Sequence, residues 1–369
     1  MTDRFHTLAL GQSRVILDTE VGHIRTLEFG QDGRTIAPLH VAPWVTDAPI
    51  DRQAALSPTE QALAGDFLCA PFCASDVDGG PLHGWTANAP WTLTAQSEGR
   101  ETAEATYTLS RPVMGAEVTK RFAWRAGEPF LYVTHEFTGG TGSIPVSHHA
   151  MIRVSGTAAL SYSPKAIVFT GDQPQESDPA RGRSLLKYPF EGTDLGAIPL
   201  GAGGTIDVRS YPVAERHEDV VELIEAPGHS LGWTAVVREA EDDIVLLLKD
   251  GRVLPQTTLW MSNGGRDYAP WSGRHTRVLG LEDGRSFGAA GHRASSAPNA
   301  LTARGVPTAF ELGGTVTIGY AIGALPRPPG WTRIETVRVE GETLVLTSTG
   351  GESLTLPFAA SWLLGAAAA

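Results

Sequence analysis

Three short stretches of the sequence place histidine, tryptophan or carboxylate side chains where they would suit the binding of a small polar ligand. The first is PLHGWTANAPW, in which Pro81 and Gly84 hold His83 in a loop, and Trp85 and Trp91 follow it. Ligand pockets combine apolar walls with a few placed polar groups, and such walls match the C–H faces of a sugar. The stretch predicts a substrate contact from His83, although tryptophans also fill protein cores.

The second stretch is SIPVSHHAMIRV, residues 143–154, whose β-branched content predicts a strand. Alternation places His148 on the apolar face and His149 on the polar face. Because the two rings point in opposite directions, they do not suit a single metal ion. We therefore expect His148 in the core and His149 at a ligand groove, unless a β-bulge reverses the two faces.

The third stretch is NGGRDYAPWSGRHTRVLGLEDGRSF, residues 263–287. A glycine-rich loop with Trp271 leads into the strand HTRVLGLE, which is expected to end at Glu282 before a turn at Asp283-Gly284. Gly280 shares the face of Glu282 and leaves room beside the carboxylate. Desolvation at the mouth of an apolar strand would raise the pKa of this glutamate and suit it to act as a base. The alternative is an ordinary exposed glutamate at a strand end.

The elements that must position these residues are predicted to be mostly strands. Glycine and proline are spread through the whole chain and separate short runs of alternating apolar and polar residues, which is typical of an all-β protein. The clearest expected strands cover residues 13–18, 104–110, 130–137, 220–226, 243–249 and 315–322. Towards the C-terminus, residues 332–358 predict three antiparallel strands joined by turns at Glu340-Gly341-Glu342 and Thr349-Gly350-Gly351.

Helical signals are few. Ser57-Pro58-Thr59-Glu60 is a capping box with proline at the first helical position, and Gly65 follows the short helix that it predicts. Many strands with little helix indicate two packed sheets, so we expect a large antiparallel β-sandwich that forms one domain over residues 1–369. The segment from Gly171 to Gly204 is rich in proline, glycine and charge, and indicates a long surface excursion that is either a lid or a decorated loop.

Composition excludes several classes of function. The net charge is −12, and no run of lysine and arginine mixed with aromatic residues is present, which argues against nucleic acid and anionic membranes as partners. Cys69 and Cys73 are the only cysteines and provide neither a disulfide framework nor zinc-type spacing. The charged N-terminal stretch does not resemble a secretory signal, and no apolar run approaches the ~18 residues of a membrane span. A soluble, cytoplasmic protein is expected.

Taken in order, the three stretches resemble the aldose 1-epimerase family, the galactose mutarotase-like proteins of the large β-supersandwich fold. The resemblance covers roughly residues 10–325. VGHIRTLEFGQDGRTIAPLHVAPW is similar to the family's opening glycine, strand, glycine turn and PL segment, and GDFLCAPF to its lead into the substrate loop. PLHGWTANAPW resembles HGFAR followed by tryptophan, HHAMIRV resembles the HPYFRV-type strand, and RVLGLEDG resembles the segment around the general base.

The resemblance implies an isomerase that interconverts the α and β anomers of a hexose or related sugar by general acid/base ring opening. Glu282 would be the base and His149 the acid, or His148 if the strand is bulged, while His83 would donate a hydrogen bond to the sugar. Neither a metal nor a cofactor is implied, and no P-loop or GxGxxG motif is present. Further substrate contacts are expected from His148, Trp85, Asp66, Asn263 and Trp271.

The sequence departs from the family pattern at two positions. Ala87 stands where HGFAR has arginine, and Asp283 replaces the proline that commonly follows the glutamate. The missing arginine disfavours a hexose phosphate, because phosphate recognition favours forked guanidinium groups. The alternatives are a noncatalytic carbohydrate-binding or regulatory protein of the same fold, and a lyase or an epimerase acting at another carbon. The expected partner is a small-molecule sugar, and the oligomeric state is left open.

Overall fold

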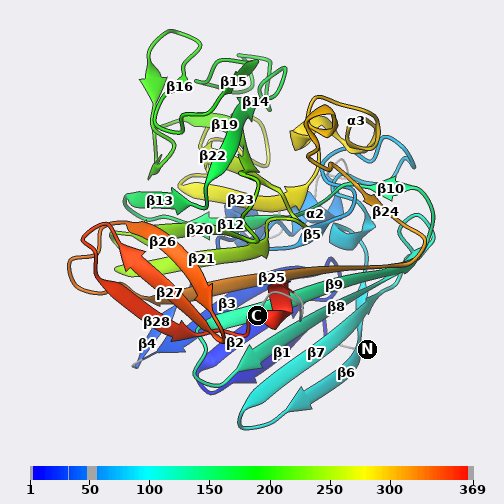
Figure 1. Ribbon diagram of the computed structural model, residues 1–369. Helices are drawn as coiled ribbons and strands as arrows, with labels where there is room; N and C mark the ends of the chain where they lie inside the picture. Colours follow the sequence, from blue (N-terminus) through cyan, green and yellow to red (C-terminus); the bar gives the residue numbers. More distant parts are fainter. Residues whose placement is uncertain (1–2, 32, 48–55, 365–369) are drawn as a thin grey trace.

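The computed structural model describes residues 3–31, 33–47 and 56–364, and two large antiparallel sheets make up most of it (Figure 1). The eight-stranded sheet has the order β15 (Phe190–Gly192), β14 (Lys165–Thr170), β19 (His217–Glu225), β22 (Gln256–Asn263), β23 (Val278–Arg285), β11 (Val146–His148) and β5 (Leu68–Cys69), with β12 (Ala150–Arg153) paired to β23. The expected all-β architecture is confirmed.

The nine-stranded sheet packs against the eight-stranded one. Its order is β18 (Ser210–Tyr211), β13 (Ala158–Tyr162), β20 (Leu231–Arg238), β21 (Asp243–Asp250), β25 (Thr315–Pro326), β9 (Phe130–Gly139), β8 (Ala116–Arg125), β7 (Thr102–Leu109) and β6 (Trp91–Glu98). Apolar side chains from both sheets, such as Leu279 and Tyr320, form the main core between them. This burial is the largest favourable contribution to folding.

Each large sheet has a second buried face. The outer face of the nine-stranded sheet is covered by a three-stranded sheet of β26 (Ile334–Glu340), β27 (Thr343–Ser348) and β28 (Ser353–Pro357), together with α4 (Ser361–Leu364). The far face of the eight-stranded sheet carries a smaller cluster that includes Phe67, Trp260 and Trp271. His149 lies at this cluster, because its ring stacks on Phe67 and meets Trp260 edge-on.

The remaining elements are short. β1 (Phe5–Leu10), β2 (Ser13–Asp18), β3 (His23–Gln31) and β4 (Arg34–Ile36) form a four-stranded sheet, and β10 (Ser143–Ile144) pairs with β24 (Phe310–Glu311). The helices are α1 (Pro43–Thr46), α2 (Pro58–Gln61), α3 (His292–Ser296) and α4, with single turns η1 (Trp85–Ala87), η2 (Gly288–Ala290) and η3 (Thr302–Arg304). Within the described ranges, no helix has the length and apolar character needed to cross a bilayer.

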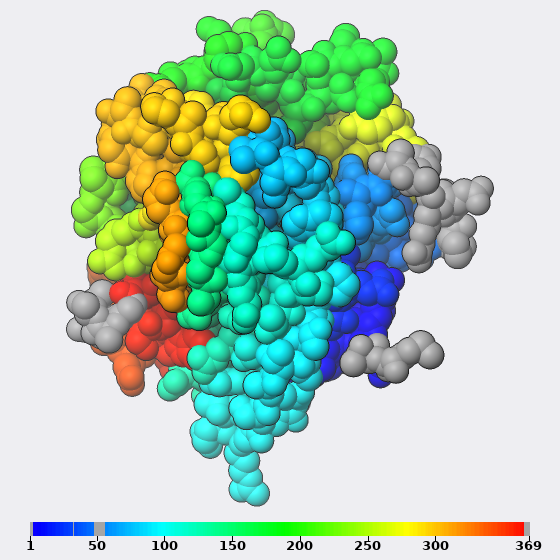
Figure 2. Space-filling model, turned by 90° about the vertical axis from the view of Figure 1, so that its right-hand side faces the viewer, coloured from blue at the N-terminus to red at the C-terminus, as the bar shows by residue number. Residues whose placement is uncertain are grey.

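Most local predictions are confirmed. The expected strands, including the three C-terminal ones, are present, and Ser57 and Glu60 form the reciprocal hydrogen bonds of the capping box. The segment from Gly171 to Gly204 contains β15, at the edge of the eight-stranded sheet, and β16 (Ile198–Pro199), which pairs with β17 (Thr205–Ile206). Its green surface lies at the top of Figure 2, next to the yellow-to-orange surface that includes α3.

Two expectations about strands need correction. The stretch 143–154 is three short strands, because Pro145 and His149 interrupt the ladder. The strand carrying Glu282 begins at Val278 and continues to Arg285, so Glu282 is not at its end and Asp283-Gly284 is not a turn. The side chain of Asp283 has buried partners, which hold the strand in extended conformation past the expected turn.

Candidate active site

Strand pairing brings His149 and Glu282 together on the far face of the eight-stranded sheet. Ser147 pairs with Gly284 and Ala150 pairs with Leu281, so the continuous register places His149 opposite Glu282. His149 Nε2 lies 3.3 Å from Glu282 Oε1, and each residue is 5 % exposed. No bulge reverses the faces, because the same register holds on both sides of His149.

Asp66 fixes the backbone and the ring beside this pair. Its Oδ1 accepts a hydrogen bond of 2.9 Å from the His149 backbone N–H, and its Oδ2 accepts one of 2.9 Å from Nδ1 of His148. Asp66 itself is 2 % exposed. Asp66 thus holds both histidines, and each of its carboxylate oxygens already accepts one hydrogen bond within the protein.

Aromatic groups surround the ring of His149. It stacks on Phe67 with centroids 4.6 Å apart, meets Trp260 edge-on at 5.5 Å, and meets His83 edge-on at 5.1 Å. Such packing restricts the ring to one orientation towards Glu282. His83 is thereby brought to the pair, as the sequence predicts for a substrate-contacting group.

A strained loop sets the orientation of His83. Its φ of 64° is in the left-handed region, and the next residue, Gly84, allows the chain to approach the carbonyl of Ala70, which a Cβ would meet at 1.8 Å. The backbone N–H of Cys73 donates a 3.3 Å hydrogen bond to Nδ1 of His83. A neutral imidazole that accepts at Nδ1 carries its proton on Nε2, so His83 has an N–H donor left for a ligand.

Burial controls the protonation of the pair. Desolvation lowers the pKa of His149 to about 4, and desolvation followed by the charge of Glu222 raises the pKa of Glu282 well above its ordinary value. Both shifts favour the uncharged forms, a protonated carboxyl beside a neutral imidazole, and in that form the pair holds one titratable proton. A protonated carboxyl beside neutral imidazole and a carboxylate beside imidazolium contain the same number of protons, and the 3.3 Å contact lets them interconvert.

Gly280 provides the space that the sequence predicts beside Glu282. A Cβ at this position would lie 2.8 Å from Cε3 of Trp260 and 3.0 Å from Oε1 of Glu282. We expect Gly280→Ala to displace the indole and the carboxylate and to destabilise the fold by about 1–3 kcal/mol, the usual cost of overpacking. Thermal unfolding and near-ultraviolet circular dichroism measure the effect. Gly314→Ala is the control, because a Cβ at that position would meet no atom within 4 Å. Gly305→Ala would not serve, because the φ of Gly305 is +79° and a side chain there would be strained. Equal effects of Gly280→Ala and Gly314→Ala would contradict the expectation.

Several residues predicted as sugar contacts lie elsewhere. His148 is fully buried in the core between the sheets, where its ring stacks on Tyr320. Trp85 packs against the same core and is covered by the guanidinium of Arg111, 4.4 Å from the ring centroid. Asn263 donates to the carbonyl of Ala214 and accepts from the N–H of Arg277, so its amide is used within the protein. The structure does not bring these three side chains to the pair.

Trp271 lies one layer behind the pair. Its ring meets Trp260 at 6.2 Å, and the guanidinium of Arg266 lies 4.2 Å from its centroid. Arg266 also forms a 3.2 Å ion pair with Glu218, and its charge lowers the pKa of both His149 and Glu282. Trp271 thus supports a cationic group near the site.

The polar residues that sequence reasoning missed are Arg266, Glu218 and Glu222. Arg266 stands in the glycine-rich loop, and an arginine among glycines and aromatic residues is a signal that was available. Glu218 and Glu222 share one face of β19 by simple alternation. Their closeness to Glu282 depends on strand order: Glu222 pairs with Thr258 on β22, and Thr258 pairs with Glu282 on β23.

Comparisons with known proteins identify the fold. No family model matches the sequence, and no curated protein matches it. Among solved structures, a galactose mutarotase-like protein from Clostridium acetobutylicum is 12 % identical with a TM-score of 0.53, over 87 % of this chain and 94 % of the other. A galactose mutarotase related enzyme from Lactobacillus acidophilus is 10 % identical with a TM-score of 0.52, over 88 % and 98 %. At such identities the similarity concerns the fold, and it confirms the expected fold class.

Proposed function

We propose that this chain, which has the galactose mutarotase-like fold, interconverts the α and β anomers of a neutral hexose or related sugar. The proposal rests mainly on one observation, the 3.3 Å contact between His149 Nε2 and Glu282 Oε1 on the far face of the eight-stranded sheet. A base and an acid side by side suit a hemiacetal, in which the anomeric hydroxyl and the ring oxygen are bonded to the same carbon.

In the proposed reaction, Glu282 accepts the proton of the anomeric hydroxyl while His149 donates a proton to the ring oxygen. The bond between the anomeric carbon and the ring oxygen breaks, and the open aldehyde forms. Rotation about the adjacent carbon–carbon bond exposes the other face of the carbonyl. The two proton transfers then run in reverse, so ring closure gives the opposite anomer and restores both side chains.

His83 and Asp66 have supporting parts in the proposal. The Nε2–H of His83 would donate a hydrogen bond to a sugar hydroxyl, because Nδ1 already accepts from Cys73. Asp66 would act as a positioning residue, since it holds the His149 backbone and the neighbouring ring. General acid and general base catalysis each contribute about 10²- to 10⁴-fold, which is enough for a reaction that also proceeds in water.

Polarimetry tests the proposed function directly. A freshly dissolved single anomer of glucose or galactose is mixed with purified protein, and the approach to the equilibrium optical rotation is followed against buffer alone. Faster equilibration supports the proposal. Sugar binding without acceleration would contradict it and favour a noncatalytic binder, while an unsaturated product absorbing in the ultraviolet would favour a lyase.

The pH dependence follows from the shared proton. We expect a bell-shaped profile of kcat/KM, because the reaction needs exactly one titratable proton on the pair. On the acid side activity should fall at about pH 4, where His149 takes up a second proton and Glu282 is no longer available as a base. On the alkaline side it should fall above the raised pKa of Glu282, where the pair loses its proton. Rates corrected for the spontaneous reaction at each pH measure this, and an acid limb at the ordinary pKa of histidine, about 6.5, would contradict it.

A further inference from the structure

Four buried carboxylates lie on β19, and three of them have a basic partner within the protein. The three pairs are Glu218–Arg266, Asp219–His217 and Glu225–Lys165, with contacts of 3.2, 2.8 and 2.5 Å. The fourth carboxylate, Glu222, is 2 % exposed and forms no ion pair with any described lysine, arginine or histidine. Because buried charges in proteins are normally paired, Glu222 stands out as the carboxylate of this strand that lacks a counter-charge.

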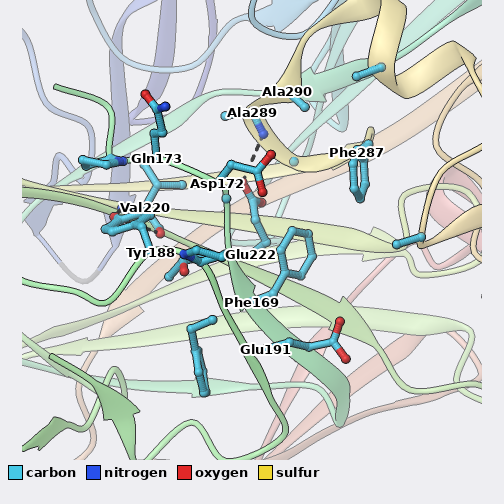
Figure 3. A pocket seen from close by; sticks show the side chains of 18 of the residues that line it. Phe169, Asp172, Gln173, Tyr188, Glu191, Val220, Glu222, Phe287, Ala289 and Ala290 are labelled. Atoms are coloured by element: carbon cyan, nitrogen blue, oxygen red, sulfur yellow. Dashed lines mark hydrogen bonds between the residues drawn. The ribbon is translucent and has the colours of Figure 1, made fainter. Parts of the chain in front are cut away.

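Glu222 is also the one of these four carboxylates that lines a cavity. The cavity measures about 810 Å³, and its walls come from β14, β15, β19 and η2 and from the segment that follows Gly171 (Figure 3). Ligand pockets commonly measure about 300–1,000 Å³. Neither His149 nor Glu282 lines this cavity, so it is a second ligand-sized hollow, distinct from the candidate active site.

The carboxylate of Glu222 is held by neutral donors that leave it room for one more. Its Oε2 accepts hydrogen bonds from Gln256 Nε2 at 2.6 Å and Thr258 Oγ1 at 2.5 Å, and its Oε1 accepts one from the Ala289 N–H at 3.2 Å, which is dashed in Figure 3. Gly288 permits the last contact, because a Cβ there would lie 2.9 Å from Oε1. A carboxylate has about four lone-pair sites, so Oε1 retains one acceptor site for a ligand.

Aromatic rings without a cation of their own line the same cavity. The four partly exposed rings are those of Phe169, Tyr188, Phe190 and Phe287. Among the described residues, no lysine or arginine lies over any of these four rings, whereas arginines cover rings elsewhere, such as Arg111 over Trp85. The face of an aromatic ring attracts a cation that lies within about 6 Å of its centroid. These rings therefore offer a cationic ligand a surface that the protein itself leaves free.

The other charges of the lining agree with a cationic ligand. None of the described lining residues is lysine, arginine or histidine, and Asp172 and Glu191 add to the acidic character. Glu191 is already paired with Arg304 at 3.0 Å, which leaves Glu222 as the buried acceptor. A metal ion is disfavoured, because Ca²⁺ takes about 6–8 oxygen ligands and the described residues contain no group of three or more histidine, cysteine or acidic side chains suited to a metal.

We propose that this cavity binds an organic ammonium ion, whose N–H donates to Glu222 Oε1 and whose charge lies against the aromatic rings. The ligand expected is a primary amine on an apolar body. Its ammonium group supplies the counter-charge that Glu222 lacks, and its body occupies the remainder of the cavity. This site is separate from the proposed anomer interconversion and does not depend on it.

Binding of an ammonium ion should be linked to the ionisation of Glu222. Burial raises the pKa of this carboxyl to about 7. The titratable groups near it are Glu282 and Cys73, whose pKa values its charge raises, and Asp172 and Glu191 in the lining, and none of these is cationic. A bound cation favours the carboxylate, so below about pH 7 binding should release a proton and become weaker.

Isothermal titration calorimetry with 2-phenylethylamine tests the site. Its neutral and anionic counterparts are 2-phenylethanol and 3-phenylpropionate, and an alkylammonium group, with a pKa of about 10, stays protonated over the range used. Titrations at about pH 5.5 and about pH 8.5, in buffers of different ionisation enthalpy, give the affinity and the number of protons released. Glu222→Gln removes the charge, and Glu335→Gln makes the same change at an exposed position on β26 as the control.

A second pair of variants tests the place of binding, and circular dichroism checks the fold of all four variants. Ala290→Trp puts an indole at an exposed position that lines the cavity. Ala297→Trp adds the same indole at an exposed position after α3 that does not line it, and is the matched control. If Glu222→Gln does not fold, the pH dependence of the wild type and the tryptophan pair still decide the outcome.

The wild type is expected to bind the amine about 10-fold more tightly than the alcohol, to bind the propionate least, and to bind the amine about 10-fold more tightly at pH 8.5 than at pH 5.5. Glu222→Gln should weaken amine binding at pH 8.5 by about 10- to 100-fold, the effect of losing one charge-assisted hydrogen bond, and abolish proton release. Ala290→Trp should weaken it as well, and both controls should match the wild type. The proposal is overturned by absence of amine binding, by equal affinity for amine and alcohol, or by wild-type affinity in Glu222→Gln or Ala290→Trp.

Discussion

Glu282→Gln is expected to abolish catalysed anomer interconversion while sugar binding largely survives. Glutamine keeps the shape of the side chain but cannot accept the proton of the anomeric hydroxyl. Removing a positioned general base costs about 10²- to 10⁴-fold in rate. The measurement is the optical rotation of a freshly dissolved anomer, corrected for the rate in buffer, at the pH of maximal wild-type activity.

The control for this variant is Glu335→Gln, which makes the same chemical change at an exposed position on β26. It should equilibrate the sugar as fast as the wild type does. Binding to both variants is measured by isothermal titration calorimetry. Near wild-type mutarotation by Glu282→Gln would remove this carboxylate from the mechanism, and loss of binding together with activity would point to a structural role.

Lys249→Met is expected to cause the largest loss of stability. Lys249 Nζ lies 2.6 Å from Asp283 Oδ1 and 3.2 Å from Glu225 Oε1, and the Lys249 and Asp283 side chains are each 1 % exposed. Methionine fills similar space but leaves Asp283 without its counter-ion in the core. Breaking a buried pair by removing one partner typically costs about 3–5 kcal/mol. Urea unfolding followed by tryptophan fluorescence measures the loss in the free energy of unfolding.

Two further variants separate an unpaired buried charge from a general effect of the substitution. Arg338→Met removes one member of an exposed pair with Glu340, which is expected to cost about 0–1 kcal/mol. The double variant Lys249→Met, Asp283→Asn should be more stable than Lys249→Met alone, because it removes the uncompensated carboxylate. A loss for Lys249→Met no greater than that for Arg338→Met would contradict the expected cost.

The same buried pair bears on the candidate active site, because Asp283 is the chain neighbour of Glu282 and its side chain points to the opposite side of the sheet. Asp283 accepts hydrogen bonds from Thr257 Oγ1 at 2.6 Å and from the hydroxyl of Tyr320 at 2.9 Å. These contacts anchor β23 to its neighbours on one side, while the side chain of Glu282 faces His149 on the other. The aspartate that replaces the expected proline is thus a structural anchor of the strand.

The sequence alone was sufficient wherever the evidence was local. Period-two alternation predicted that His148 faces the core and His149 the other side, and the capping box at Ser57 predicted α2. Both follow from backbone geometry over a few residues, which does not depend on the rest of the chain. The place of Gly280 beside Glu282 followed from the same alternation.

Long-range packing determines which strands are neighbours in the sheet, and the alternation of residues along one strand does not show this. A strand pattern says which face a side chain occupies, but not which strand lies next to it. The row from Glu222 through Thr258 to Glu282 therefore became visible only with the sheet order. Likewise, Asp66 contacts both histidines because residues far along the chain bring them to its carboxylate, and β23 passes the predicted turn because Asp283 has buried partners. Contacts between residues far apart in the chain stabilise these arrangements. No short window of sequence contains both partners of such a contact.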